Sequence, residues 1–260
     1  MLRRRHQKRR GRRNPRRFRD RPVAHYLVGG ICLILTAGLV YAFVQYLRES
    51  KVFSVKWIYV EGASVLDPQV VLAASGITTR DNLLFFDAKT AAQRVEALPY
   101  VEDCTFERIF PDTVVLTIAE RCPAATLLVN NRFYELDAAC VAMRELAWDQ
   151  VHPGPLITNV PGLATLVPGQ KVALPPITAA LAVWNAFASI SMALDVTVSE
   201  LAALGENQIL MYCDELEYEI RWGRGDFEGQ ARRLDILWQE KNKQIGCKQY
   251  LDLRFGNDLV

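Results

Sequence analysis

The sequence predicts an α+β protein with one membrane-spanning helix near its N-terminus, followed by two folded domains. One long stretch carries no formal charge, the next 70 or so residues read as a strand, two helices and two strands, and the remainder reads as short strands and turns. We therefore expect a basic tail over 1–22, a transmembrane helix over 23–47, a first external domain over 52–121, and a β-rich domain with a C-terminal helix and strand over 122–260.

The uncharged stretch runs from Pro22 to Leu47, with Tyr26, Tyr41 and Tyr46 toward its ends. About 20 apolar residues cross a bilayer as a helix, and aromatic rings favour the interfaces. A cleaved signal peptide is the alternative, but its apolar core has roughly 7–15 residues and a small-residue cleavage site after it. This stretch is longer and no such site follows, so the sequence favours a membrane anchor.

A basic run precedes the uncharged stretch, with twelve Lys or Arg residues and one acid, Asp20, between Arg3 and Arg21. Such a run can bind nucleic acid, or it can hold the N-terminus in the cytoplasm next to anionic lipid headgroups. After Leu47 there remain 19 basic and 28 acidic residues, a net charge of −9. An acidic external region disfavours nucleic acid as a partner, and we interpret the tail as a topology signal.

The first external domain is predicted element by element from its pattern. The stretch 52–62 alternates as a strand does, and the helix over 67–76 has Asp as its N-cap, Pro at its first position and Gly past its end. A second helix over 87–99 also starts at an Asp and is stopped by Pro. Two strands follow, over 100–110 and 113–121. The residues of the last strand that we expect in the core are Val114, Leu116 and Ile118.

The second domain begins with a hairpin signal, Asn130-Asn131 between apolar runs. A helix is predicted after Pro175-Pro176, and two strands are predicted within 206–223. The apolar face predicted for this helix consists of Ile177, Leu181, Trp184 and Ala188. The strand residues predicted to be buried are Tyr218, Ile220 and Trp222.

The segment Gly223–Asp226, with the sequence GRGD, allows three interpretations. Its glycine spacing fits neither a dinucleotide fingerprint nor a Walker loop, and an adhesion motif of this length arises easily by chance. We favour a strand-to-helix turn in which Asp226 is the N-cap. The apolar stripe expected on the helix that follows is Phe227, Ala231, Leu234 and Trp238.

No pattern typical of catalysis is present, so we expect no enzyme activity, no cofactor and no metal. His152 is the one histidine after the membrane helix, and as a loop residue it is expected to be solvated. Neither G-x-S-x-G nor H-E-x-x-H occurs. The cysteines outside the membrane are odd in number, which leaves any disulfide pattern open, and we favour buried free thiols. They are Cys104, Cys122, Cys140, Cys213 and Cys247.

The element order β-α-α-β-β resembles a POTRA domain, the polypeptide-transport-associated module. Three segments more narrowly resemble the FtsQ/DivIB family of bacterial cell-division proteins: VEG at Val60–Gly62, the stretch from Leu98 to Ala125, and YLDLRF at Tyr250–Phe255. The family's Arg-x-x-Pro corner is matched by Arg108 and Pro111. Its Glu-Arg-x-Pro exit is matched by Glu120, Arg121 and Pro123.

The resemblance implies a non-enzymatic scaffold in the bacterial cytoplasmic (inner) membrane, with its C-terminal domain outside, at the division septum. Its implied partners are FtsB/DivIC-like and FtsL-like division proteins and other divisome membrane proteins, and the POTRA domain is implied in recruitment. A POTRA-type envelope assembly or transport factor is the alternative, although that class normally adds a β-barrel. An envelope hydrolase with an unrecognised site is a third class.

Partner contacts are implied at the last strand, Tyr250–Phe255. We expect Tyr250, Asp252 and Arg254 on one exposed face, while Phe255 alternates with them toward the core although it aligns with a contact aromatic. The candidate partner-binding residues are Tyr250, Asp252, Arg254, Phe255 and Asn257. For Arg108, Glu120 and Arg121 we favour solvated ion pairs at strand ends over partner contacts.

Overall fold

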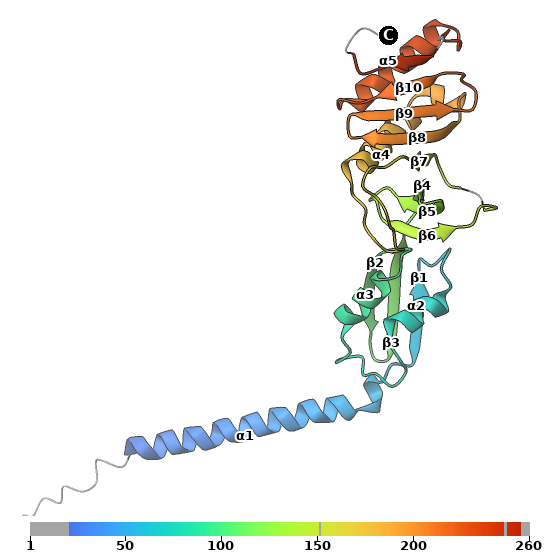
Figure 1. Ribbon diagram of the computed structural model, residues 1–260. Helices are drawn as coiled ribbons and strands as arrows, with labels where there is room; N and C mark the ends of the chain where they lie inside the picture. The colour runs from blue at the N-terminus through green and yellow to red at the C-terminus, as the bar shows by residue number, and fades with distance from the viewer. Residues whose placement is uncertain (1–20, 151, 247–248, 256–260) are drawn as a thin grey trace, which may run out of the picture.

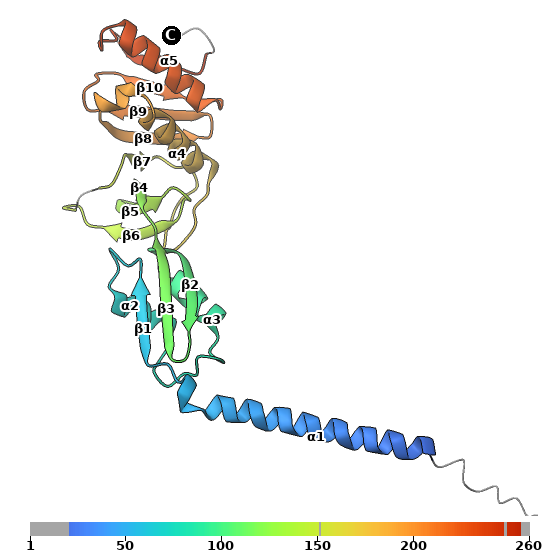
Figure 2. The same cartoon turned by 180° about the vertical axis from the view of Figure 1, so that it is seen from behind.

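The computed structural model describes residues 21–150, 152–246 and 249–255. The predicted basic run between Arg3 and Arg21, except Arg21 itself, and the candidate residue Asn257 lie outside these ranges. Figures 1 and 2 show an elongated molecule: a long helix leaves from one end of a small α+β unit, and a larger sheet with two helices is stacked on that unit's other end.

The N-terminal helix α1 spans Arg21–Glu49, slightly more than the predicted 23–47. Its segment His25–Glu49 is long and apolar enough to cross a membrane, and no residue of its most apolar window is buried against the rest of the described chain. A long helix that is apolar on all sides and exposed over most of its length is typical of a membrane span. This finding confirms the predicted N-terminal apolar helix.

The small unit has the predicted order β-α-α-β-β. Its elements are β1 (Trp57–Glu61), α2 (Pro68–Ser75), α3 (Ala88–Glu96), β2 (Val101–Ile109) and β3 (Thr113–Glu120). The sheet order is β1-β3-β2, with β1 parallel and β2 antiparallel to the central β3. Both helices cover one face of the sheet, as Figure 1 shows.

The helix-capping residue and the helix-ending glycine predicted in this unit adopt the expected conformations. Asp67 accepts a hydrogen bond from Gln69 N–H at 2.8 Å, and Gly76 ends α2 with φ 69°. Gly62 has φ 83°, and a Cβ there would lie 2.1 Å from the Ile118 carbonyl oxygen, so only glycine fits. One boundary is wrong: the strand begins at Trp57, because 51–53 form a short 3₁₀-helix, η1.

The larger unit is one eight-stranded sheet in the order β11-β10-β9-β8-β7-β4-β5-β6. Helices α4 and α5 contact each other, and α4 packs on β8 and β9. The elements are β4 (Pro123–Val129), β5 (Arg132–Asp137), β6 (Ala142–Leu146), β7 (Leu156–Thr158), α4 (Pro175–Ala188), β8 (Val198–Gly205), β9 (Gln208–Cys213), β10 (Glu219–Trp222), α5 (Phe227–Glu240) and β11 (Tyr250–Asp252).

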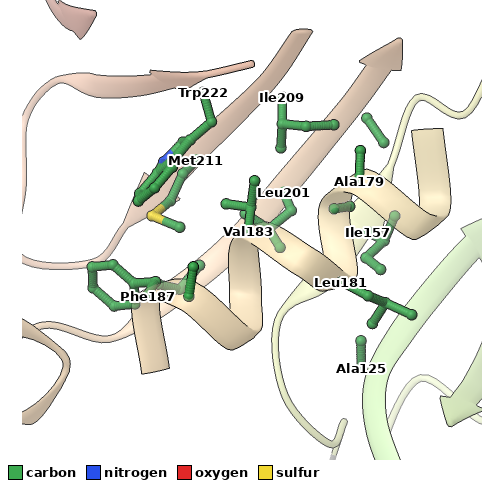
Figure 3. Packing of buried hydrophobic residues seen from close by; sticks show 14 of the residues in the cluster. Ala125, Ile157, Ala179, Leu181, Val183, Phe187, Leu201, Ile209, Met211 and Trp222 are labelled. Carbon is green, nitrogen blue, oxygen red and sulfur yellow. The ribbon is translucent and has the colours of Figure 1, made fainter. Parts of the chain in front are cut away.

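The core of this unit lies between α4 and the sheet. In Figure 3 Val183 and Phe187 of α4 lie over Leu201 and Met211 of the strands, and all four side chains are fully buried. The predicted face of α4 was therefore partly wrong, since Ala188 is exposed. Because α4 contacts both the sheet and α5, its buried arc includes Val183 and Phe187 outside the predicted stripe, whereas Ala188 is the last residue of the helix and is exposed.

The turn predictions are confirmed. Asn130 and Asn131 both have positive φ, 47° and 66°, as a two-residue hairpin with the sheet's twist requires. Asp226 caps α5 by accepting from Gly229 N–H at 3.2 Å. A Cβ at Gly223 would lie 2.0 Å from the Asn207 carbonyl oxygen, so the chain needs glycine at that position.

The described cysteines are all free thiols, and Cys104, Cys140 and Cys213 are buried, in agreement with the favoured interpretation. Burial raises the pKa of Cys104 to about 11 and that of Cys213 to about 12. Such thiols stay protonated and behave as small apolar side chains. Cys122 is exposed, and Cys247 lies outside the described residues.

Candidate partner-binding site

The last strand, β11, lies at one edge of the eight-stranded sheet, at the end of the molecule farthest from α1 (Figure 1). It pairs in parallel with β10, with Tyr250 opposite Glu219 and Asp252 opposite Arg221. Helix α5 connects the two strands, which is the connection that parallel neighbours need. No described strand lies on the outer side of β11.

The backbone of β11 offers hydrogen-bonding groups at this edge. Glu219 N–H donates to the Gln249 carbonyl at 3.4 Å, and Leu253 N–H donates to the Arg221 carbonyl at 3.0 Å. In a parallel ladder alternate residues bond to the same neighbour. The N–H and C=O groups of Tyr250 and Asp252 therefore face away from β10, where another strand could pair with them.

The side chains beside this edge form a linked row on the face opposite α4. The guanidinium of Arg221 lies 3.6 Å from the centre of the Tyr250 ring. The Nε of Arg221 donates to Glu219 at 2.7 Å, and the hydroxyl of Tyr212 donates to the same carboxylate at 3.0 Å. Burial and the hydrogen bond to Glu219 raise the pKa of Tyr212, so its phenol stays protonated as a donor.

Asp252 is not the exposed charge that we expected. It is 2% exposed, and Arg254 donates to both of its oxygens, from Nε at 2.9 and 3.1 Å and from a terminal nitrogen at 2.5 Å. Burial acts to raise the pKa of Asp252, but the hydrogen bonds from Arg254 outweigh it and lower the pKa. The pair stabilises the end of β11, because it joins the last residue of the strand to Arg254, two residues beyond it.

Phe255 does not occupy the core position that we expected. The ring is 45% exposed, whereas Leu251 and Leu253 fill the core. The strand ends at Asp252, so strand alternation does not extend to Phe255. The guanidiniums of Arg224 and Arg254 lie 4.9 and 5.8 Å from the ring centre. An exposed aromatic between two arginines is a composition common in interface hot spots.

Glu219 and Arg221 alternate with the predicted buried residues Ile220 and Trp222, but the sequence analysis did not connect them to the site. The missing step was the pairing of β10 with β11. A strand, a helix of 14 residues and a second strand are the signal for a parallel pair. That signal would have brought Arg221 next to Tyr250.

A second cluster lies at the joint between the two units. Arg121 follows β3 and donates to Asp137 of β5 at 2.8 Å, with side chains only 16% and 7% exposed. The hydroxyl of Tyr100 donates to the buried Glu135, which also accepts from Arg144 at 3.0 Å. Burial and the bond to Glu135 raise the pKa of Tyr100, which keeps it a donor. These contacts join the small unit to β5 and β6.

The expected solvated ion pairs at the strand ends are therefore not what the structure shows. Arg121 forms a mostly buried pair across the joint. Glu120 accepts from the hydroxyl of Ser64 and from the backbone N–H of Leu66 at 2.8 Å. Arg108 donates to the Phe86 carbonyl at 2.9 Å and lies over its ring at 4.6 Å. Sequence alone shows the charges but not these distant partners.

The structure also corrects the expectation that His152 is a solvated loop residue. Its ring packs 4.5 Å from the ring of Phe133, so it is a partly buried packing residue and not a solvated one. Within the described part of the chain, no three His, Cys, Asp or Glu side chains gather as metal ligands would.

Comparison with known proteins matches the two units separately. Residues 53–121 match the family described as POTRA domain, FtsQ-type, and residues 128–254 match Cell division protein FtsQ/DivIB, C-terminal. The chain belongs to the FtsQ/DivIB family. It is a cell-division family, and its members are non-catalytic.

Some curated FtsQ relatives align with most of this chain. Cell division protein FtsQ of Syntrophotalea carbinolica is 26% identical over 97% of this chain and 93% of its own. The FtsQ of Geotalea daltonii is 23% identical over 90% of this chain and 85% of its own. The FtsQ of Corynebacterium glutamicum is 37% identical, but over only 38% of this chain and 42% of its own. The FtsQ resemblance thus extends across both units and the joint.

Proposed function

We propose that this FtsQ-family chain is a membrane-anchored scaffold of the division apparatus that acts by binding other proteins. The observation that carries the proposal is the outer edge of β11, where the backbone groups of Tyr250 and Asp252 face away from β10. A strand of a partner can add there, as in other β-augmentation complexes. The exposed Phe255 would give such a partner an aromatic contact.

Under this proposal α1 crosses the bacterial cytoplasmic membrane, the basic tail stays in the cytoplasm, and both units lie outside, at the septum. The expected partners are FtsB/DivIC-like and FtsL-like division proteins. The charge asymmetry before α1 supports this orientation. Changing the twelve basic residues to Gln or Ser should impair insertion or invert the topology, and unchanged topology reporters would contradict this account of the tail.

A backbone experiment tests the edge directly. Tyr250→Pro removes an N–H that β10 does not use, whereas Tyr250→Ala removes the ring and keeps the N–H. Pro is tolerated on edge strands. One hydrogen bond contributes about 1 kcal/mol, roughly fivefold in affinity. We expect Tyr250→Pro to bind an FtsB/DivIC-like partner about fivefold more weakly than Tyr250→Ala.

Leu253→Pro is the matched control, because its N–H donates inward to Arg221. It should lose binding and destabilise the fold together, as circular dichroism would show. Phe255→Lys should weaken binding while the fold survives. If Tyr250→Pro and Phe255→Lys both stay folded and bind as the parent does, the partner-binding site lies elsewhere.

The scaffold role has its own test in cells. A fluorescent fusion of the full chain should enrich at midcell, and smooth labelling of the envelope would count against the role. Depletion should give filaments without septa. Loss of outer-membrane proteins on depletion would instead support the alternative, an envelope assembly factor. Deleting 52–121 should abolish midcell placement if the POTRA unit recruits the protein.

A further inference from the structure

The end of the POTRA unit next to α1 carries an exposed apolar cluster. We call it the membrane-proximal base and define it as Val52, Phe53, Phe85 and Phe110. Val52, Phe85 and Phe110 are 60%, 42% and 58% exposed. The rings of Phe53 and Phe110 meet edge to face with 6.5 Å between their centres. Side chains from three separate segments therefore form one patch, which exceeds the scattered exposure of single apolar residues.

The membrane-proximal base is tied to the end of α1. Only Ser50 separates α1 from η1, which contains Val52 and Phe53. The side-chain amide of Asn82 donates to the carbonyls of Leu47 and Arg48 at 2.8 and 3.1 Å. These carbonyls belong to the last turn of α1, whose acceptors have no partner within the helix. The base therefore has to lie where α1 leaves the membrane.

The loop that contains Asn82 also holds the patch together. Leu83 N–H donates to the Phe53 carbonyl at 2.7 Å, and Phe85 follows two residues later. The guanidinium of Arg48 lies 5.1 Å from the centre of the Phe85 ring. Lys51 and Arg80 are exposed in the same region. Aromatic rings next to basic side chains suit the headgroup layer, where ring bodies leave water and cations meet lipid phosphates.

We propose that the membrane-proximal base inserts into the headgroup layer of the membrane that α1 crosses. The inference rests on the proposed anchoring by α1. Insertion at a second point beside the helix restricts the tilt of the POTRA unit. It would thereby set the height at which β11 is presented to partners, since the two units are joined by buried pairs.

The test uses the full chain in nanodiscs of phosphatidylethanolamine and phosphatidylglycerol. Trifluoromethyl-phenylalanine replaces Phe85, Phe110 or Phe255, one at a time, and fluorine NMR reads each site. Phe255 is the matched control, because it is the same residue type, is 45% exposed, and follows β11 at the edge of the larger sheet, in the other unit. We expect a lipid with a nitroxide headgroup to relax positions 85 and 110 several-fold more than 255. A water-soluble gadolinium chelate should reverse that order.

Two further readouts separate this inference from the anchoring on which it rests. If the chain does not remain with the nanodiscs in flotation, the anchoring by α1 fails. If it remains, but positions 85 and 110 relax as 255 does, insertion of the base is overturned alone. Asn82→Ala should keep the chain in the nanodisc and reduce the lipid effect at 110. An unchanged lipid effect in that variant would overturn the role of Asn82 as a tether.

Discussion

The two edges of the eight-stranded sheet differ in how they are covered. At the β6 edge, Ala142 N–H donates to the Gln170 carbonyl at 2.9 Å, and Gly169 N–H donates to the Ala142 carbonyl at 2.7 Å. The joint to the POTRA unit lies beside the same edge (Figure 2). At the other edge, no described strand pairs with the outer side of β11. Proteins normally protect sheet edges against pairing with other chains, so the unpaired β11 edge is the one at which we propose that a partner binds.

The buried acids at the two edges show the same difference. Asp137, the last residue of β5, is paired with Arg121 at the end of the POTRA unit, and Glu135 is bonded to Tyr100 of the same unit. Asp252, the last residue of β11, is paired with Arg254, only two residues further along the chain. Long-range pairs close an internal interface. A local pair instead stabilises one strand and leaves its outward backbone groups available.

Removal of the long-range pair should have the largest effect. Arg121→Ala leaves Asp137 buried without its cation, and breaking a buried pair costs about 3–5 kcal/mol. Two backbone N–H groups also donate to Asp137, so we expect a loss of about 3 kcal/mol. Urea unfolding of the full chain in detergent, followed by tryptophan fluorescence, measures it. A change below about 1 kcal/mol would show that the joint does not depend on this pair.

Removal of the local pair should have a smaller effect on stability. Asp252→Ala leaves Arg254 able to reach water, because its side chain is already 23% exposed. Hydrogen bonds to charged groups contribute about 1.5–3 kcal/mol, and we expect a loss near 2 kcal/mol. Partner binding should fall as well, since β11 loses the contact that shapes its end. Full affinity in a folded Asp252→Ala would contradict the involvement of β11.

The sequence predicted the local features of this fold well. Asp67, Asp87 and Asp226 were each predicted as helix caps, and each accepts the expected backbone hydrogen bond. Asn130 and Asn131 were predicted as a hairpin turn. These signals act within a few residues of the chain, so a single sequence contains all that is needed to recognise them.

The candidate site was predicted less well, because its geometry depends on distant segments. The burial of Asp252 and the stacking of Tyr250 on Arg221 follow from the pairing of β11 with β10, which are joined through α5. The pairs at the joint link Arg121 to Asp137 and Tyr100 to Glu135 across a unit boundary. Charges at strand ends are visible in a sequence, but the partners that neutralise them are not.

A pH experiment compares Arg121 with its neighbour Glu120, whose contacts stay inside the POTRA unit. Burial acts to raise the pKa of Glu120, but hydrogen bonds from Ser64, Leu66 and Val65 outweigh it and lower the pKa to about 2 from 4.5. Because the folded pKa is the lower one, the stabilisation is complete above pH 4.5 and is lost as pH falls toward 2.

Glu120→Gln should therefore differ from the parent chain by a constant amount in unfolding free energy above pH 4.5, and the difference should shrink between pH 4.5 and about 2. Thermal unfolding of both chains across this range measures the difference. We expect it to be smaller than that for Arg121→Ala, because Glu120 is only partly buried. A difference that stays constant down to pH 2 would show that the carboxylate is not the stabilising form.

The smallest effect is expected at an exposed pair on the same strands as the joint. Arg132 of β5 donates to Glu145 of β6 at 3.3 Å, and the two side chains are 63% and 47% exposed. Exposed pairs contribute at most about 1 kcal/mol and are screened by salt. Arg132→Ala should therefore lower the unfolding free energy by less than about 1 kcal/mol, and high salt should abolish the difference. This pair matches Arg121–Asp137 in chemistry but not in burial. An equal loss of unfolding free energy in Arg132→Ala and Arg121→Ala would therefore show that burial is not what makes the joint stable.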